Sequence, residues 1–250
     1  MKNFNLVGLL VFSSLLFVNC EKDSNIVVDD SAEVQVDPIG LVARSIPQDR
    51  LDGEDSELFW TVFKDRGDAT ITFPFTDQFP GNFELSYQNT RNTVGGKGWE
   101  GGSDRAIGYN VGSLSGNFNF VGVYGWAEFT DVEYYVIEKG DGDVNDREYE
   151  LVRSYAADGK TYNFYRRSVI NAPCALSSNN CDFWQYKSVR QNQPNDITGT
   201  NGRISMAIHA EVWRNSRFGF GDYTQYQVFG IEGFSGNAQS SGGMNATVFR

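Results

Sequence analysis

From Leu58 onward, apolar and polar residues alternate in short segments separated by turn residues. A period of two is typical of β-strands that bury one face, and the Gly, Asp and Asn residues between the segments favour hairpin turns. The pattern predicts strands over residues 59–64, 69–73, 83–89, 93–96, 106–109, 118–128, 132–138, 148–154, 161–167, 183–191, 223–230 and 245–249.

One segment departs from this alternation. Ile204, Ala207, Ile208 and Val212 recur at helical spacing and predict a helix over residues 204–213. His209 falls on its apolar side and is expected to be a hydrogen-bonded core residue. An all-β chain with a single helix late in the sequence favours a curved two-sheet β-jelly roll.

The N-terminus has the features of an export signal. Residues 1–20 combine a basic Lys2 with an apolar stretch, too short for a transmembrane helix, that ends at Cys20. This arrangement resembles a bacterial lipoprotein signal, in which Cys20 is lipidated and anchors an outer-membrane or cell-surface protein. The alternative is plain secretion after ordinary cleavage.

Residues 21–56 are acidic and poor in aromatic residues, and Pro38, Pro47 and Gly53 interrupt any periodicity. They predict a flexible tether before a folded domain over residues 57–250. The alternative is an N-terminal strand that adds to the sheet, with Ile26-Val27-Val28 as its best candidate.

Composition narrows the function classes. The chain of 250 residues is 40% hydrophobic, and its 14% aromatic share and 27 glycines suit strands and turns. A net charge of −11 argues against nucleic acid and anionic membrane surfaces as partners. One histidine and three cysteines give no zinc-type cluster, so no metal site is expected.

Two glutamates about a hundred residues apart stand out against this background. Glu133 follows the run Val123-Tyr124-Gly125-Trp126, and Glu232 lies in Gln227-Val228-Phe229-Gly230-Ile231-Glu232-Gly233-Phe234. A carboxylate on an aromatic-lined, partly buried strand face is destabilising unless it is paired or has a task. Two such groups facing each other across a cleft are what glycoside hydrolysis requires.

Seven motifs in order from Leu58 to the C-terminus resemble the landmarks of the glycoside hydrolase family 11 endo-xylanases. They are Gly96-Lys97-Gly98-Trp99, Tyr124-Gly125-Trp126, Glu133-Tyr134-Tyr135, Asn171-Ala172-Pro173, Gln185-Tyr186, Ser188-Val189-Arg190 and Glu232-Gly233-Phe234. The resemblance implies a jelly roll with its helix on the convex side and a substrate such as xylan, or a related β-1,4-linked polysaccharide, on the concave face. It also implies hydrolysis of internal xylosidic bonds with retention and without a cofactor. We expect the protein to be a monomer.

By the same resemblance, Glu133 is the nucleophile and Glu232 the acid/base, with hydrogen bonds keeping Glu133 ionised and its charge keeping Glu232 protonated. The positions matching the family's cleft are Tyr124, Tyr135, Tyr226, Gln185, Phe63 and Asn92. The asparagine at position 92 implies a neutral or mildly alkaline optimum.

Residues 171–182 correspond to the family's thumb, a hairpin loop that closes over substrate and includes Pro173. Cys174 and Cys181 lie seven residues apart across this loop and, in an exported protein, are expected to form a disulfide. Two reduced thiols are the alternative.

The sequence departs from the family pattern at four positions. Val169 replaces an arginine, Phe63 a stacking tryptophan, Lys187 a tryptophan and Thr130 a proline. These changes favour either a divergent xylanase or a weakly active carbohydrate-binding lipoprotein, and a β-glucanase on the same fold is a further alternative.

Overall fold

The computed structural model describes residues 44–46, 50–128, 131–145, 147–176, 180–223, 225–235 and 239–250, all within the compact unit Val36–Arg250. Cys20, Thr130 and the stretch around Ile26 lie outside the described residues. The described part contains one helix, α1, and no helix in it is long and apolar enough to cross a membrane.

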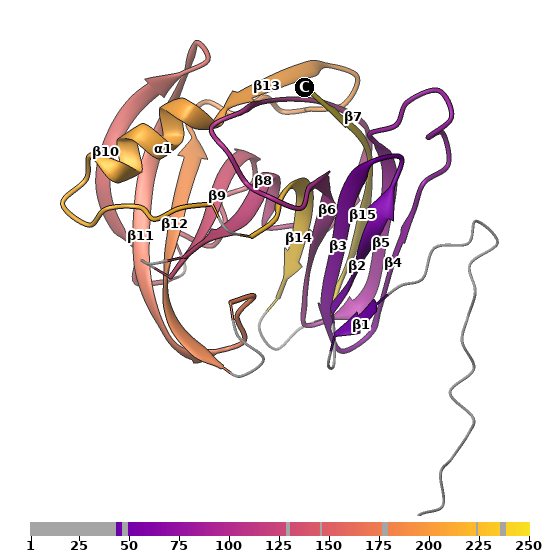
Figure 1. Cartoon of the computed structure of the whole chain (residues 1–250), viewed down its shortest axis with the longest axis horizontal. Coiled ribbons are helices and arrows are strands. Elements are labelled where there is room, and N and C mark those ends of the chain that lie inside the picture. The colour runs from indigo at the N-terminus through magenta and orange to yellow at the C-terminus, as the bar shows by residue number, and fades with distance from the viewer. Residues whose placement is uncertain are drawn as a thin grey trace, which may run out of the picture. The chain divides into compact units, whose positions relative to one another are not determined.

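Two β-sheets make up the unit (Figure 1). The larger has ten strands in the order β1-β2-β3-β6-β14-β8-β9-β12-β11-β10. In that order, the bounds are Arg44–Ile46, Arg50–Asp55, Leu58–Asp65, Asn92–Trp99, Gln227–Phe234, Phe120–Ala127, Val132–Lys139, Cys181–Arg190, Lys160–Ala172 and Glu150–Ala157. Its neighbouring strands are antiparallel except for β9 and β12, which are parallel.

The smaller sheet has five strands in the order β13-β7-β15-β5-β4. Their bounds are Asn201–Ser205, Ala106–Gly116, Ser240–Phe249, Asn82–Thr90 and Asp68–Thr72. Helix α1 spans Met206–Arg214 and lies over the β10–β12 side of the larger sheet (Figure 1). Two sheets with a single helix confirm the predicted fold class.

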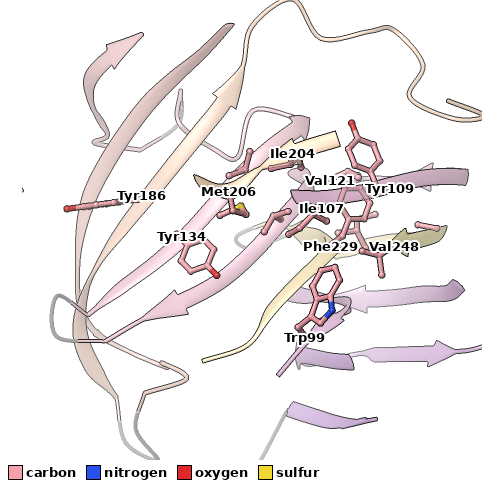
Figure 2. Packing of buried hydrophobic residues seen from close by; sticks show 14 of the residues in the cluster. Trp99, Ile107, Tyr109, Val121, Tyr134, Tyr186, Ile204, Met206, Phe229 and Val248 are labelled. Carbon is pink, nitrogen blue, oxygen red and sulfur yellow. The ribbon is translucent and has the colours of Figure 1, made fainter. Parts of the chain in front are cut away.

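The main hydrophobic core lies between the two sheets (Figure 2), and it includes Met206 and Ala210 of α1. Tyr109 of β7 stacks on Phe229 of β14 with ring centroids 4.4 Å apart, which joins the sheets. Trp213 brings α1 into the same core. A second cluster covers the opposite face of the larger sheet, because alternation along each strand sends every second side chain there.

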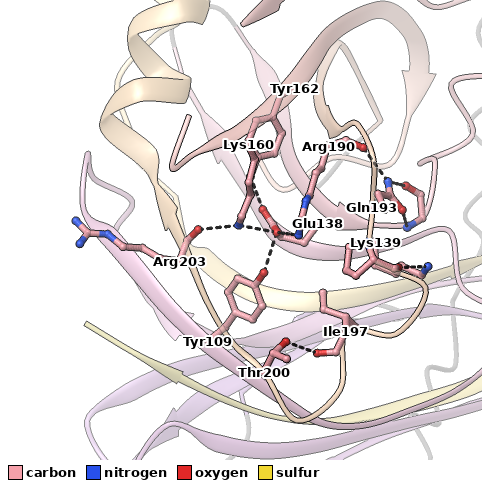
Figure 3. A network of polar contacts seen from close by, with 12 residues as sticks. Tyr109, Glu138, Lys139, Lys160, Tyr162, Arg190, Gln193, Ile197, Thr200 and Arg203 are labelled. Atoms are coloured by element: carbon pink, nitrogen blue, oxygen red, sulfur yellow. Dashed lines mark hydrogen bonds and ion pairs between the residues drawn. The ribbon is translucent and has the colours of Figure 1, made fainter. Parts of the chain in front are cut away.

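A buried carboxylate fastens the core side of the larger sheet to its neighbours (Figure 3). Glu138 accepts hydrogen bonds from the hydroxyls of Tyr109, at 2.8 Å, and of Tyr162, and from Lys160 and Arg190 at 2.8 and 3.1 Å. These donors come from β7, β11 and β12, so the network ties both sheets together. Glu138 lies on the core side of the larger sheet, whereas Glu133 and Glu232 lie on its opposite face.

The helix prediction needs correction. Ile204 lies in strand β13, which pairs with β7 and ends at Ser205, and α1 begins at Met206. The buried side of α1 consists of Met206, His209, Ala210 and Trp213 rather than the series that the sequence suggested. His209 is a core residue, as expected, and burial lowers its pKa to about 3.

The predicted tether is also too long. Residues 50–55 form β2, which pairs with β3 from Arg50↔Phe63 to Asp55↔Leu58. Asp55 is buried, and its carboxylate lies 2.5 Å from the ammonium of Lys97, a residue with no exposed side-chain surface. The sheet therefore begins before residue 57, with a strand other than the Ile26 candidate.

Candidate active site

Glu133 lies on β9, on the face of the larger sheet that points away from the main core. Its partner across the ladder is Trp126 of β8, and the neighbouring pair is Tyr124↔Tyr135. The Tyr124 hydroxyl donates to Glu133 Oε1 at 2.9 Å, and it accepts from Trp126 Nε1 at 2.8 Å. The chain of donors ends on the carboxylate, so it stabilises the ionised form.

Gln185 of β12 supplies the second hydrogen bond, with Nε2 donating to Glu133 Oε2 at 2.6 Å. Its other amide atom, Oε1, accepts from the Tyr149 hydroxyl at 2.6 Å and from Arg167 Nη2 at 2.8 Å. Because an arginine side chain has only donors, it fixes which end of the amide is oxygen. The Gln185 amide NH2 group therefore faces Glu133, and Glu133 accepts the hydrogen bond.

Glu232 lies on β14, the strand on the other side of β8, opposite Phe120 of β8 and Val94 of β6. It is buried like Glu133, each with 7% of its surface exposed. The pKa of Glu232 is raised to about 7, mainly by burial, with the charges of Glu133 and Asp143 adding to the rise. No hydrogen bond from a described residue to its carboxyl offsets this.

Glu133 differs in this respect. Burial also raises its pKa, but hydrogen bonds from Gln185, Tyr124 and Tyr135 and the charge of Lys187 all oppose the rise. Tyr135 is close enough to both carboxyl groups for each of their charges to raise the pKa of its phenol. The two glutamates therefore form a coupled pair in which Glu133 has the environment of a carboxylate and Glu232 that of a carboxylic acid.

Lys187 brings a buried positive charge to this pair. Only 3% of its surface is exposed, and its ammonium donates to the Gly142 carbonyl at 2.6 Å and lies 4.7 Å from the ring centroid of Tyr135. Its charge lowers the pKa of both Glu133 and Glu232. Lys187 is paired with Tyr135 and lies on the same face of β12 as Gln185, so it places a cation beside the two glutamates.

The remaining sequence-predicted positions also gather on this face. Tyr226 stacks on Phe59 with centroids 5.5 Å apart, and Phe63 packs against the same cluster. Asn92 of β6 is paired with Phe234, two positions along β14 from Glu232, and its side-chain oxygen is buried without a hydrogen-bond partner. The structure therefore brings the predicted aromatic lining and Asn92 to the side of Glu133 and Glu232.

The loop after β11 reaches the same surface. Cys174 and Cys181 form a disulfide with their Cα atoms 6.0 Å apart. Both cysteines, together with Ala175 and Leu176, pack against the cleft-facing cluster, while Pro173 is exposed. The disulfide prediction is confirmed, and the loop lies on the same face of the larger sheet as the predicted catalytic residues.

Sequence reasoning missed Arg167 and Tyr149. Arg167 is opposite Gln185 in the β11–β12 ladder, two residues before the Val169 that replaces the family arginine. Only the register of the two strands reveals this pairing. Alternation along the run Tyr165-Arg166-Arg167 places Tyr165 and Arg167 on one face of the strand and Arg166 on the other. This alternation was the available signal.

Comparison with known proteins agrees with this geometry. Residues 55–245 match the family described as glycosyl hydrolases family 11. The chain is 32% identical over 213 residues to endo-1,4-beta-xylanase 3 of Pyricularia oryzae, covering 84% of this chain and 83% of that protein. It is 34% identical over 202 residues to endo-1,4-beta-xylanase Xyn11B of Cellvibrio japonicus, covering 78% of this chain and 53% of that protein.

A solved structure from a comparison of two endo-1,4-beta-xylanases of Trichoderma reesei shares the fold. It superposes with a TM-score of 0.63 at 24% identity, covering 80% of this chain and 99% of that chain. The ordered landmarks, the two-sheet fold and the match over most of the sequence lead to one assignment: the chain belongs to glycosyl hydrolase family 11.

Proposed function

We propose that the protein is a retaining endo-1,4-β-xylanase in which Glu133 is the nucleophile and Glu232 the general acid/base. The observation that carries the assignment of roles is the asymmetry of the two buried carboxyl groups. Glu133 accepts hydrogen bonds from Tyr124 and Gln185, whereas Glu232 has a pKa raised to about 7 beside it. Retaining hydrolysis needs one carboxylate and one carboxylic acid in this arrangement.

In the first step Glu133 attacks the anomeric carbon while Glu232 gives its proton to the departing glycosidic oxygen. Forming the glycosyl-enzyme removes the negative charge of Glu133, and with it one cause of the raised pKa of Glu232. Glu232 then becomes a better carboxylate. In the second step it takes a proton from water, which attacks the anomeric carbon and releases Glu133 with net retention.

The aromatic residues are suited to holding the sugar chain. Tyr124, Tyr135 and Tyr226 present rings and phenols on one face, and Tyr124 and Tyr135 have centroids 5.2 Å apart. Rings stack on pyranose faces, and phenols hydrogen-bond to hydroxyls or to the reacting carboxylate. Gln185 and Asn92 would add amide contacts, and Pro173 would approach substrate from the loop above.

For the whole chain we propose export, with Cys20 lipidated and residues 21 to about 43 forming a tether to a bacterial membrane. The signal-like residues 1–20 and the acidic stretch that follows support this proposal. The beginning of β1 at Arg44 sets the limit of the tether, because β1 already pairs with β2 in the larger sheet. Secretion without the lipid is the alternative outcome.

A non-catalytic or weakly active carbohydrate-binding protein is the second candidate, favoured by Val169, Phe63 and Lys187 at positions where the family has other residues. A β-glucanase is the third. Release of reducing ends from xylan, barley β-glucan and carboxymethylcellulose by the full chain distinguishes the three candidates. Cleavage of xylan alone supports the proposal, whereas a folded protein that cleaves none of them contradicts it.

Glu133→Gln and Glu232→Gln should each lower xylan hydrolysis by orders of magnitude with unchanged circular dichroism. An aryl xylobioside with a dinitrophenolate leaving group separates the roles, since that leaving group needs no protonation. Glu232→Gln should retain a burst of dinitrophenolate release, while Glu133→Gln should show none. A burst from Glu133→Gln alone would reverse the assignment.

A further inference from the structure

The surroundings of the candidate active site are basic in an otherwise acidic chain. The protein has a net charge of −11, yet Arg147, Arg167 and Lys187 lie around Glu133 and Glu232. Among the described residues, none of the three forms an ion pair with a carboxylate, although eight other cation–carboxylate contacts occur elsewhere in that part of the chain. Cations near the two glutamates that have no carboxylate partner suggest that this partner arrives with the substrate.

Two of these cations can reach a ligand. Lys187 is buried and bonded to the Gly142 carbonyl, whereas Arg147 and Arg167 are half-buried and line a hollow of about 480 Å³ together with Glu148 and Ser168. Arg147 precedes β10, and Arg167 comes from β11. The hollow is therefore approached by guanidinium groups from two different segments.

Aromatic rings hold both guanidinium groups in place. Arg147 lies over Phe234, 4.3 Å from the ring centroid, and Arg167 lies 5.1 Å from the centroid of Tyr149. Arg167 donates hydrogen bonds from Nε and Nη2 to the Gln185 side-chain oxygen, and its Nη1 remains as a donor for a ligand. Stacked, planar guanidinium groups with remaining donors match the geometry of a carboxylate.

The charge of the hollow suits a monoanion. Two arginines and Glu148 give a net charge of +1, and the Glu148 carboxylate and Ser168 offer acceptors for sugar hydroxyls. The hollow also adjoins the reaction centre, because Arg167 holds the Gln185 that binds Glu133, and the charge of Arg147 acts on Glu232. A group bound in the hollow would therefore be a substituent of the polysaccharide whose backbone lies at Glu133 and Glu232.

We propose that Arg147 and Arg167 form a subsite for the carboxylate of a uronic acid substituent on the xylan backbone, an inference that rests on the proposed function. The subsite would make an acidic, glucuronosyl-substituted xylan the preferred substrate. The subsite would also position the xylan backbone relative to Glu133, because Arg167 contacts the Gln185 that binds Glu133.

The test compares glucuronoxylan with the same polymer after its carboxyl groups have been reduced to alcohols. The readout is the ratio of kcat/KM on the acidic polymer to kcat/KM on the reduced one, measured for the full chain. Effects of a substitution on Glu232 or on folding cancel in this ratio. The ratio for the unsubstituted protein should exceed one and should fall as salt is added.

Arg147→Gln should lower the ratio about tenfold, the effect expected of a charge-assisted hydrogen bond at a half-exposed site. Arg147→Lys should retain part of it, since the charge remains but the fork is lost. Arg203→Gln is the matched control, because it makes the same charge change on an exposed residue of β13 in the other sheet. An Arg147→Gln ratio equal to that of Arg203→Gln would overturn the subsite.

Binding separates this inference from the proposed function. If the unsubstituted protein cleaves neither polymer, the proposed function fails, and calorimetric titration with a glucuronosyl xylotetraose against its carboxyl-reduced form still tests the subsite. Tighter binding of the acidic sugar that Arg147→Gln abolishes would support it. Equal binding of the two sugars would refute it.

Discussion

The most demanding prediction concerns Asp55, a residue of the stretch that the sequence assigned to a tether. Its carboxylate is the only charged partner of Lys97 among the described residues, with the two groups 2.5 Å apart. Lys97 has no exposed side-chain surface, and burial lowers its pKa while Asp55 opposes the change. Asp55→Ala would leave a buried ammonium without its counter-charge.

The magnitude follows from what remains around the ammonium. Removing one partner of a buried ion pair typically destabilises by about 3–5 kcal/mol. Lys97 would keep the carbonyl of Pro80 at 2.7 Å and that of Asn82 at 3.4 Å, and it lies 4.6 Å from the ring centroid of Phe73. These neutral groups solvate part of the charge, so we expect the lower end of the range, about 3 kcal/mol, or roughly 6–12 °C in Tm for a domain of this size.

Urea unfolding followed by tryptophan fluorescence measures the loss, since the chain has 5 tryptophans. Glu54→Ala is the matched control on the same strand, because Glu54 is exposed, and it should change stability by less than about 0.5 kcal/mol. A chain that begins at residue 57 should lose at least as much stability as Asp55→Ala, because it lacks β2 as well.

The dependence on pH gives an independent check. In the Asp55→Ala protein the pKa of Lys97 falls further below that of the unfolded chain, so the unfolded state binds more protons and stability rises with pH. The deficit should therefore shrink between pH 7 and about pH 10, near the pKa of a lysine in the unfolded chain. A loss below about 1 kcal/mol, or a deficit that grows with pH, would refute the reasoning.

Two further predictions concern the pKa values of the two glutamates, and a third concerns the disulfide. In the proposed mechanism Glu232 acts as an acid and must be protonated; since its pKa is raised to about 7, xylan hydrolysis should fall as pH rises through about 7. Lys187→Met removes a charge that lowers the pKa of both glutamates and should move both limbs of the kcat/KM profile to higher pH; an unmoved profile would contradict this role. Replacing Cys174 and Cys181 with serine should destabilise the protein by about 2 kcal/mol in thermal unfolding, since the disulfide closes a short loop. Stability equal to that of the unsubstituted protein kept under reducing conditions, but below that of the oxidised protein, would attribute the loss to the bond itself.

The sequence predicted most of the larger sheet because its strands bury one face and alternate accordingly. Strand β2 escaped detection, since Arg-Leu-Asp-Gly-Glu-Asp has a single large apolar residue and no alternation. What places it in the sheet is backbone pairing with β3 and the contact of Asp55 with Lys97, and both partners lie later in the chain. The helix start was predicted two residues too early for a different reason: Ile204 of β13 and Met206 of α1 are both fully buried, so burial alone does not separate the end of the strand from the beginning of the helix.

The site was predictable to the extent that it follows strand periodicity. Alternation alone places Glu133 and Tyr135 of β9 on one face with Tyr124 of β8, and the structure confirms that face. The function of Arg167 depends instead on cross-strand register, which brings it opposite Gln185. The catalytic roles of Glu133 and Glu232 stay predictions until the variants are measured.

The departures from the family pattern acquire a common meaning in this geometry. Val169 lacks the charge of the arginine expected there, yet two residues earlier Arg167 acts on Glu133 through Gln185, and Lys187 acts on it from the neighbouring strand. Positive charge beside Glu133, the proposed nucleophile, has therefore been relocated rather than lost. Because Arg167 also lines the hollow beside Arg147, the relocated charge is open to a ligand. A protein that only binds xylan would gain nothing from positive charge acting on Glu133. A hydrolase acting on an acidic xylan would use both the charge that acts on Glu133 and the charge that is open to a ligand in the hollow.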